Sequence, residues 1–174
     1  MFKHIVLVDD ELNILKSLQR ELHEWAEGRG YRITLCNSPH QVLALLEEQN
    51  GQVDLIISDL RMPEMLGSDL LTIIKNRWPR IVSILLTGYS ETSEIIKAVK
   101  AGIFSYILKP WNSDYLLTEI EKGLESAQLH EENRRHQDRM EKELQWAGEL
   151  QRAILNVNLP QDPRSNIVAS YRPM

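Results

Sequence analysis

The chain has 174 residues, 43% of them hydrophobic, and a formal net charge of −5. This length is enough for one domain with a buried core and an extension, and the acidic balance argues against nucleic acid as a partner. The single cysteine, Cys36, excludes an internal disulfide framework, and no apolar run approaches the roughly 20 residues that a membrane span requires. We therefore expect a cytoplasmic protein that contacts neither nucleic acid nor a membrane.

Short apolar runs alternate with amphipathic segments from residue 1 to about residue 127. Strands are expected at residues 5–8, 32–36, 55–58, 81–86 and 103–108. Each is followed by apolar residues at helical spacing, as at Leu12, Leu15 and Leu18, or by a helix start such as Ser38-Pro39. Five strands alternating with five helices predict an α/β fold with a parallel sheet.

Polar side chains stand at the C-terminal ends of four of these runs. Asp9 and Asp10 follow the first strand, Asp59 the third, Thr87 the fourth and Lys109 the fifth. The carboxyl ends of parallel strands meet at one edge of the sheet, which is where doubly wound folds bind ligands. We therefore expect three carboxylates, a hydroxyl and an ammonium group to converge there.

This set of groups suits a site that holds a divalent cation and a phosphoryl group. Asp59 is the candidate nucleophile, because a carboxylate oxygen can attack phosphorus and form an acyl phosphate. Asp9 and Asp10 would repel Asp59 unless a cation lay among them, and an all-oxygen site suits Mg²⁺. Thr87 and Lys109 can bind two further phosphoryl oxygens.

Four segments resemble the receiver domain of two-component response regulators. They are Val-Asp-Asp-Glu (8–11), Ser-Asp-Leu-Arg-Met-Pro-Glu-Met-Leu-Gly (58–67), Leu-Thr-Gly-Tyr (86–89) and Tyr-Ile-Leu-Lys-Pro-Trp (106–111). The resemblance covers residues 1–127, which we take as the receiver domain. It implies a flavodoxin-like five-stranded parallel sheet in the order 2-1-3-4-5 with five helices, and phosphorylation by a sensor histidine kinase.

The resemblance also implies a role for each residue of the acidic site. Asp59 would be the phosphoacceptor and Asp10 a direct Mg²⁺ ligand. Asp9 would help to hold the ion, and the backbone carbonyl of Arg61 would complete the protein ligands. The chain itself would then be a regulatory module and not an enzyme.

The resemblance further assigns a switch. Thr87 and Lys109 would contact the phosphoryl group, and Tyr106 would turn inward when Thr87 moves toward it. Tyr106 could instead be an ordinary half-buried strand tyrosine. Trp111 marks a subset of receivers that are joined to enzymatic or signalling outputs, unless it only packs against the last helix.

The composition changes after Gln128 to a region that is rich in charged residues and free of proline up to residue 157. A 4-3 spacing runs through Leu129, Asn133, His136, Met140, Glu143, Ala147, Leu150, Ile154 and Val157. We expect residues 128–157 to form a long helix and a dimeric coiled coil, in which Asn133 would fix the register. The alternative is a solvated single helix that links two domains.

The C-terminal residues carry a second resemblance. Leu150-Gln151-Arg152-Ala153-Ile154-Leu155, then Leu159-Pro160, then the strand-like Val168–Pro173 segment, are similar to the start of bacterial type 2C Ser/Thr phosphatases. The metal-binding aspartates of that family lie beyond this point, so none is carried over. We expect residues 158–174 to be the start of a truncated phosphatase-like domain.

Together these features predict a receiver that relays phosphorylation through a helix to a type 2C phosphatase-like output in a sigma-factor or stress pathway. An inactive phosphatase-like domain that serves as a protein-binding adaptor is the alternative. A DNA-binding transcription factor would need a basic face after the receiver, and the equal numbers of basic and acidic residues in 128–174 disfavour it.

Overall fold

The computed structural model describes residues 3–88 and 92–155, with side chains as far as residue 152. The chain divides into two compact units, Met1–Asn133 and Arg134–Met174. The expected Leu159-Pro160 turn, the strand-like segment at 168–173 and Tyr89 lie outside the described residues. No helix in the described part is both long enough and apolar enough to cross a membrane.

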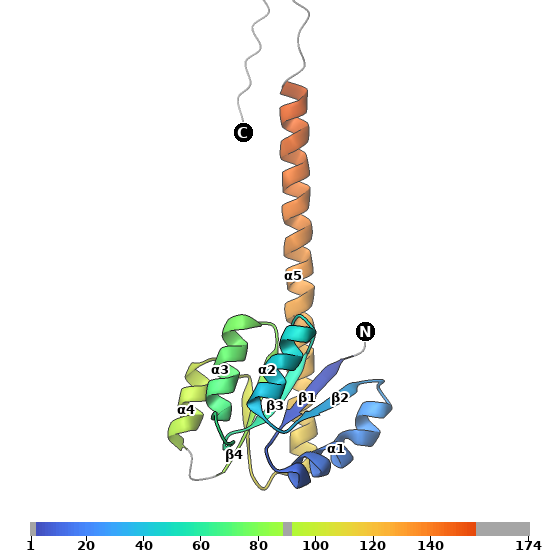
Figure 1. Ribbon diagram of the computed structural model, residues 1–174. Coiled ribbons are helices and arrows are strands. Elements are labelled where there is room, and N and C mark those ends of the chain that lie inside the picture. The colour runs from blue at the N-terminus through green and yellow to red at the C-terminus, as the bar shows by residue number, and fades with distance from the viewer. Residues whose placement is uncertain (1–2, 89–91, 156–174) are drawn as a thin grey trace, which may run out of the picture. The chain divides into compact units, whose positions relative to one another are not determined.

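The first unit is an α/β fold whose helices and strands alternate along the chain (Figure 1). Its elements are β1 (His4–Val8), α1 (Leu12–Glu27), β2 (Arg32–Cys36), α2 (Pro39–Glu48), β3 (Leu55–Asp59), α3 (Gly67–Arg77), β4 (Val82–Thr87), α4 (Thr92–Lys100), β5 (Ser105–Leu108) and α5 (Ser113–Leu155). The strands form one parallel sheet in the order β2-β1-β3-β4-β5. The predicted flavodoxin-like fold, with its long C-terminal helix, is confirmed.

Two apolar cores lie on opposite faces of the sheet, because side chains alternate along each strand. Ile5 and Leu7 pack with residues of α1 and α5, whereas Val6 and Val8 pack with residues of α2, α3 and α4. Both faces are therefore covered, which is why the central strands are continuously apolar.

Local signals fix several helix starts. The Ser38 hydroxyl accepts a hydrogen bond from the Gln41 N–H at 3.3 Å, and Pro39 occupies the first turn of α2. Asn112 Oδ1 accepts the Tyr115 N–H at 3.0 Å and so caps α5. The Ser38 cap is as the sequence predicts.

The fifth strand begins two residues later than predicted. The Ile103 N–H donates to the Ala98 carbonyl, and Gly102 has a φ of 86°, so these residues close the end of α4. The apolar run at 103–108 therefore combines a helix-terminating turn with a strand that starts at Ser105.

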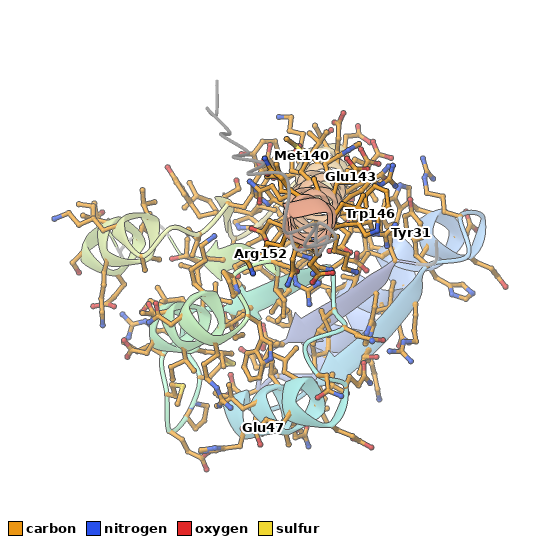
Figure 2. The ribbon with its side chains drawn as sticks, turned by 90° about the horizontal axis from the view of Figure 1, so that it is seen from above. Tyr31, Glu47, Met140, Glu143, Trp146 and Arg152 are labelled. Atoms are coloured by element: carbon orange, nitrogen blue, oxygen red, sulfur yellow. The ribbon has the colours of Figure 1, made fainter. Side chains whose placement is uncertain are left out.

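In the second unit, α5 continues to Leu155. Every residue from 134 to 152 is exposed except Gly148, which is partly buried. Figure 2 shows the side chains of this helix, including Met140, Glu143, Trp146 and Arg152, radiating around its axis. The expected coiled coil stays a prediction, because the structure holds one chain.

Candidate functional site

Three carboxylates meet at the carboxyl end of the sheet. Asp9 directly follows β1 and is completely buried, Asp59 is the last residue of β3 and is 7% exposed, and Asp10 is exposed. Since β1 and β3 are paired in parallel, their ends lie side by side. One oxygen from each carboxylate lies within 4.8 Å of the other two.

Lys109 joins this cluster from the end of β5. Its Nζ lies 2.7 Å from Asp59 Oδ1 and 3.1 Å from Asp9 Oδ2. Its backbone N–H donates to the Thr87 carbonyl at 2.8 Å, which continues the β4–β5 ladder beyond the strand ends. The ammonium group therefore balances part of the negative charge that the carboxylates concentrate here.

Burial and neighbouring charges affect the pKa values of Asp59 and Lys109 differently. At Asp59, burial raises the pKa above its usual value, and repulsion from Asp9 adds to this, although the hydrogen bond from Lys109 opposes it. At Lys109, burial disfavours the charged form, but the hydrogen bonds and attraction to Asp59 and Asp9 outweigh it and raise the pKa. The two aspartates therefore favour the charged form of Lys109. Lys109 in turn opposes the effect that burial and Asp9 have on the Asp59 pKa.

Backbone groups hold the carboxylates in place. Asp9 Oδ1 accepts the Glu11 N–H at 2.8 Å, and Asp59 Oδ2 accepts the Arg61 N–H at 3.1 Å. Arg61, whose carbonyl was expected to bind the ion, thus lies directly beside Asp59. The geometry fits a hard divalent cation, because all three side chains that could act as metal ligands offer carboxylate oxygens.

Gly67, at the start of α3, is a positioning residue to which sequence reasoning assigned no role in the site. Its N–H donates to the Leu60 carbonyl at 2.8 Å, and a Cβ at this position would collide with the Asp59 carbonyl oxygen. The only signal in the sequence is a glycine in the loop after Asp59. Glycine is needed here because the backbone of α3 approaches the backbone of β3.

Thr87 and Tyr106 lie on the neighbouring strands β4 and β5. Thr87 is 1% exposed and ends β4, so it belongs to the same sheet edge, and its hydroxyl donates to the Gly88 carbonyl at 3.3 Å. Tyr106 is 41% exposed and lines an apolar groove of about 550 Å³ together with residues of α4 such as Ile96 and Val99. The tyrosine ring therefore faces outward in this structure.

Comparison with known protein families gives a match over most of the chain. The family model of the response regulator receiver domain matches residues 5–121. Among curated proteins, the hydrogenase transcriptional regulatory protein HoxA of Cupriavidus necator is 36% identical over 126 residues, which are 72% of this chain and 25% of that protein. The transcriptional regulatory protein ZraR of Escherichia coli is 37% identical over 120 residues, which are 69% of this chain and 26% of that protein.

Solved structures agree with this match. The signal receiver domain of an HD domain-containing protein from Pseudomonas fluorescens Pf-5 has a TM-score of 0.69 and 34% identity, covering 75% of this chain and 93% of that one. A response regulator receiver domain protein from Clostridium thermocellum has a TM-score of 0.67 and 30% identity, covering 74% and 98%. The chain spans about a quarter of the length of the curated relatives, so these similarities concern the sheet domain.

Proposed function

Because this chain belongs to the response regulator receiver family, we propose that a sensor histidine kinase phosphorylates it on Asp59. The observation that carries the proposal is the convergence of Asp9, Asp10 and Asp59 within 4.8 Å, with Lys109 Nζ 2.7 Å from Asp59. The match to receiver domains and the position of Asp59 at the carboxyl end of the sheet both support it.

In the proposed reaction, an Asp59 carboxylate oxygen attacks the phosphorus atom of a phosphohistidine. A bond forms between that oxygen and phosphorus, the phosphorus–nitrogen bond breaks, and the imidazole leaves with the electron pair. Lys109 would then exchange its contact with Asp59 for one with a phosphoryl oxygen, and the Thr87 hydroxyl would bind another. Positioning and charge neutralisation supply most of the catalysis in such transfers.

Receiver domains bind Mg²⁺ at an acidic cluster of the kind formed by Asp9, Asp10 and Asp59. In this chain the three carboxylates and the backbone carbonyl of Arg61 would hold the ion. When bound, it would neutralise charge on the phosphoryl oxygens. Asp9 would then serve both the ion and Lys109, whose Nζ lies 3.1 Å from Asp9 Oδ2.

We propose that the switch runs from Thr87 to Tyr106. Movement of the Thr87 hydroxyl toward the phosphoryl group would vacate space behind β4, and Tyr106 would turn into it. The groove that Tyr106 now shares with Ile96 and Val99 would change shape. Phosphorylation would thus alter the surface formed by α4 and β5.

We propose further that residues 128–157 form a homodimer. Three exposed apolar side chains fall on the 4-3 spacing, with Leu129 54%, Met140 62% and Leu150 42% exposed. A second copy in parallel register would cover them and place the two Asn133 side chains opposite each other. A solvated linker helix is the alternative, and the size of the protein in solution decides between them.

The output is inferred from two different observations, which point to different classes of domain. The type 2C phosphatase-like output rests on residues 150–173 of the sequence alone, and an inactive adaptor domain fits those residues equally well. A DNA-binding output has its own support, because the relatives HoxA and ZraR are named transcriptional regulatory proteins. Those relatives match this chain over 126 and 120 residues. Their names therefore describe the outputs of those proteins.

The phosphoacceptor is tested by intact-mass measurement of the protein with Mg²⁺ and acetyl phosphate. Phosphoryl transfer from this donor releases acetate, and we expect a single phosphoryl adduct that hydroxylamine removes. Asp59→Asn should show no adduct. An adduct of equal yield on the Asp59→Asn variant would refute the assignment.

A further inference from the structure

The loop that follows Lys109 is tied to α1 by a tryptophan. The indole N–H of Trp111 donates to Glu21 Oε2 at 3.0 Å, and these two residues are 90 positions apart in the chain. The Trp111 ring also packs against the core formed by α1, α5 and one face of the sheet. The bond therefore fixes the backbone two residues beyond Lys109 to a rigid helix.

Glu21 carries a buried polar atom that no described residue satisfies. Its second carboxylate oxygen, Oε1, is buried and has no hydrogen-bond partner among the residues that the structure describes. A buried acceptor without a partner costs free energy, so an apolar residue would suit a purely structural role better. Among the described residues, the Glu21 carboxylate accepts its hydrogen bond from Trp111.

Hydrogen bonds restrain the chain at Lys109 itself and at Trp111, two residues later. On one side the Lys109 N–H donates to the Thr87 carbonyl at 2.8 Å, and on the other side Trp111 is held by Glu21. The Lys109 Nζ reaches both Asp59 at 2.7 Å and Asp9 at 3.1 Å, so a small shift of the backbone would change both contacts. A phosphoryl contact at this position needs the same accuracy.

We infer that the hydrogen bond between Trp111 and Glu21 positions Lys109 for its contact with the phosphoryl group on Asp59. The inference rests on the proposed function of Asp59. Trp111 and Glu21 are positioning residues, since both act through the backbone of Lys109.

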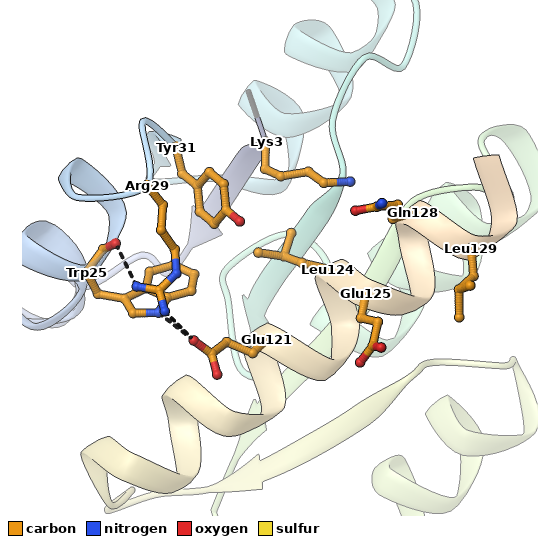
Figure 3. A pocket seen from close by; sticks show the side chains of 9 residues that line it. All are labelled: Lys3, Trp25, Arg29, Tyr31, Glu121, Leu124, Glu125, Gln128 and Leu129. Atoms are coloured by element: carbon orange, nitrogen blue, oxygen red, sulfur yellow. Dashed lines mark hydrogen bonds and ion pairs between the residues drawn. The ribbon is translucent and has the colours of Figure 1, made fainter. Parts of the chain in front are cut away.

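The structure supplies a matched control bond of the same chemistry. The Trp25 indole N–H donates to Glu121 Oε1 at 2.9 Å, so it too joins α1 to a later element (Figure 3). Glu121 also binds the Arg29 guanidinium at 3.0 Å. This cluster lies where Lys3, Tyr31 and Leu124 line a pocket. The hydrogen bonds and ion pair that join Trp25, Arg29 and Glu121 involve neither Lys109 nor the three aspartates.

The test compares Trp111→Phe with Trp25→Phe, each of which keeps an aromatic ring and removes one indole N–H. The measurement is the rate of phosphorylation by acetyl phosphate as a function of Mg²⁺ concentration, on the full chain. We expect Trp111→Phe to lower the maximal rate by about three- to tenfold with the apparent Mg²⁺ affinity within twofold of the wild type. Trp25→Phe should leave the rate unchanged.

Substitutions at Glu21 provide a second and independent readout if Trp111→Phe folds poorly. Glu21→Leu removes the acceptor and should slow phosphorylation as Trp111→Phe does, whereas Glu21→Gln keeps an acceptor oxygen and should stay within twofold of the wild type. The double variant Trp111→Phe/Glu21→Leu should be no slower than either single variant, because both remove the same bond.

An unchanged maximal rate in Trp111→Phe and Glu21→Leu would overturn the inference, as would equal slowing in Trp25→Phe. Equal slowing in Glu21→Gln and Glu21→Leu would also overturn it, because the charge and not the bond would then matter. If the wild-type protein takes up no phosphoryl group at all, the proposed function of Asp59 fails instead.

Discussion

The sheet unit and the helix that follows it differ in how deeply their apolar side chains are buried. In the sheet unit, Ile57 and Leu86 are fully buried, because helices cover both faces of the sheet. Between residues 134 and 152, Leu144 and Trp146 are 71% and 64% exposed. The helices of the sheet unit cover its central strands, whereas the apolar side chains of the later helix are left exposed and available to another chain.

This difference separates the two tasks that the protein is proposed to perform. All the residues of the acidic site belong to the sheet unit, so phosphorylation should depend on the packing of that unit alone. Association should depend on the exposed stripe of the helix, which is formed by the apolar side chains of Leu129, Met140 and Leu150. Substitutions in one region should therefore leave the task of the other region intact.

The largest effect is expected from a pair of glycine substitutions, one in each region. Gly67→Val places a branched side chain against the Asp59 carbonyl and should cost about 2–4 kcal/mol of unfolding free energy and most of the phosphoryl uptake. Gly148→Ala has open space around it in the helix and should stabilise the helix by about 0.5–1 kcal/mol. Thermal unfolding and intact mass measure both effects.

If Gly67→Val took up phosphoryl groups as the wild type does, the close approach of α3 to β3 would have no role in the site. Gly148→Ala should leave phosphoryl uptake unchanged, and a loss there would mean that the two regions are coupled at the site itself.

The next effect concerns association. Met140→Lys combined with Leu150→Lys puts two charges into the exposed stripe and should weaken self-association at least about tenfold, because charged side chains are poorly tolerated in a coiled-coil seam. Sedimentation velocity measures the change. Phosphoryl uptake serves as the control and should match the wild type, and an undiminished dimer would favour the solvated linker helix.

A smaller effect of opposite sign is expected at Asn133. Asn133→Leu replaces a polar residue at a seam position with an apolar one and should tighten self-association by a few fold. Asn133→Gln, which stays polar, is the matched control. The predicted seam would be wrong if sedimentation equilibrium gave the same association constant for the leucine variant and the wild type.

The smallest effect is a pH dependence at the opposite end of the sheet from the acidic site. His4 is buried, its Nε2 lies 2.8 Å from Thr34 Oγ1, and burial, together with the Arg32 guanidinium, lowers its pKa below 6.5. The unfolded chain then binds a proton more readily than the folded chain, so stability should fall as pH drops below about 6.5.

Denaturant unfolding between pH 7.5 and 5.5 measures this loss. His4→Asn removes the titrating group and should flatten the pH dependence in that range. An equally steep dependence in His4→Asn would assign the effect to other groups.

The sequence was sufficient for the sheet and for the convergence of the acidic site. Val8 pairs with Ser58 in the parallel register of β1 and β3, so the aspartates that directly follow these two residues had to meet. Strand ends were harder to predict, because Ile103 is apolar like a strand residue but its N–H closes α4 through Ala98. The apolar character of a residue does not show whether it closes the end of a helix or begins a strand.

Contacts between residues far apart in the chain left no signal in the sequence. Glu21 and Trp111 are 90 residues apart, and Trp25 and Glu121 are 96 residues apart. Nothing in the local pattern around either glutamate indicates a partner, because both would suit a solvated helix face. The role of Gly67 was hidden for the same reason, since it depends on where β3 lies and not on its own neighbours.

The central claim is that Asp59 carries the phosphoryl group, and chemical trapping tests it most directly. Borohydride reduces an aspartyl phosphate to homoserine, so the protein would be treated with Mg²⁺ and acetyl phosphate, reduced, digested and sequenced by mass spectrometry. We expect homoserine at residue 59, with Asp9 and Asp10 unchanged. Homoserine at Asp9 or Asp10, or none under conditions that trap a known receiver, would contradict the account.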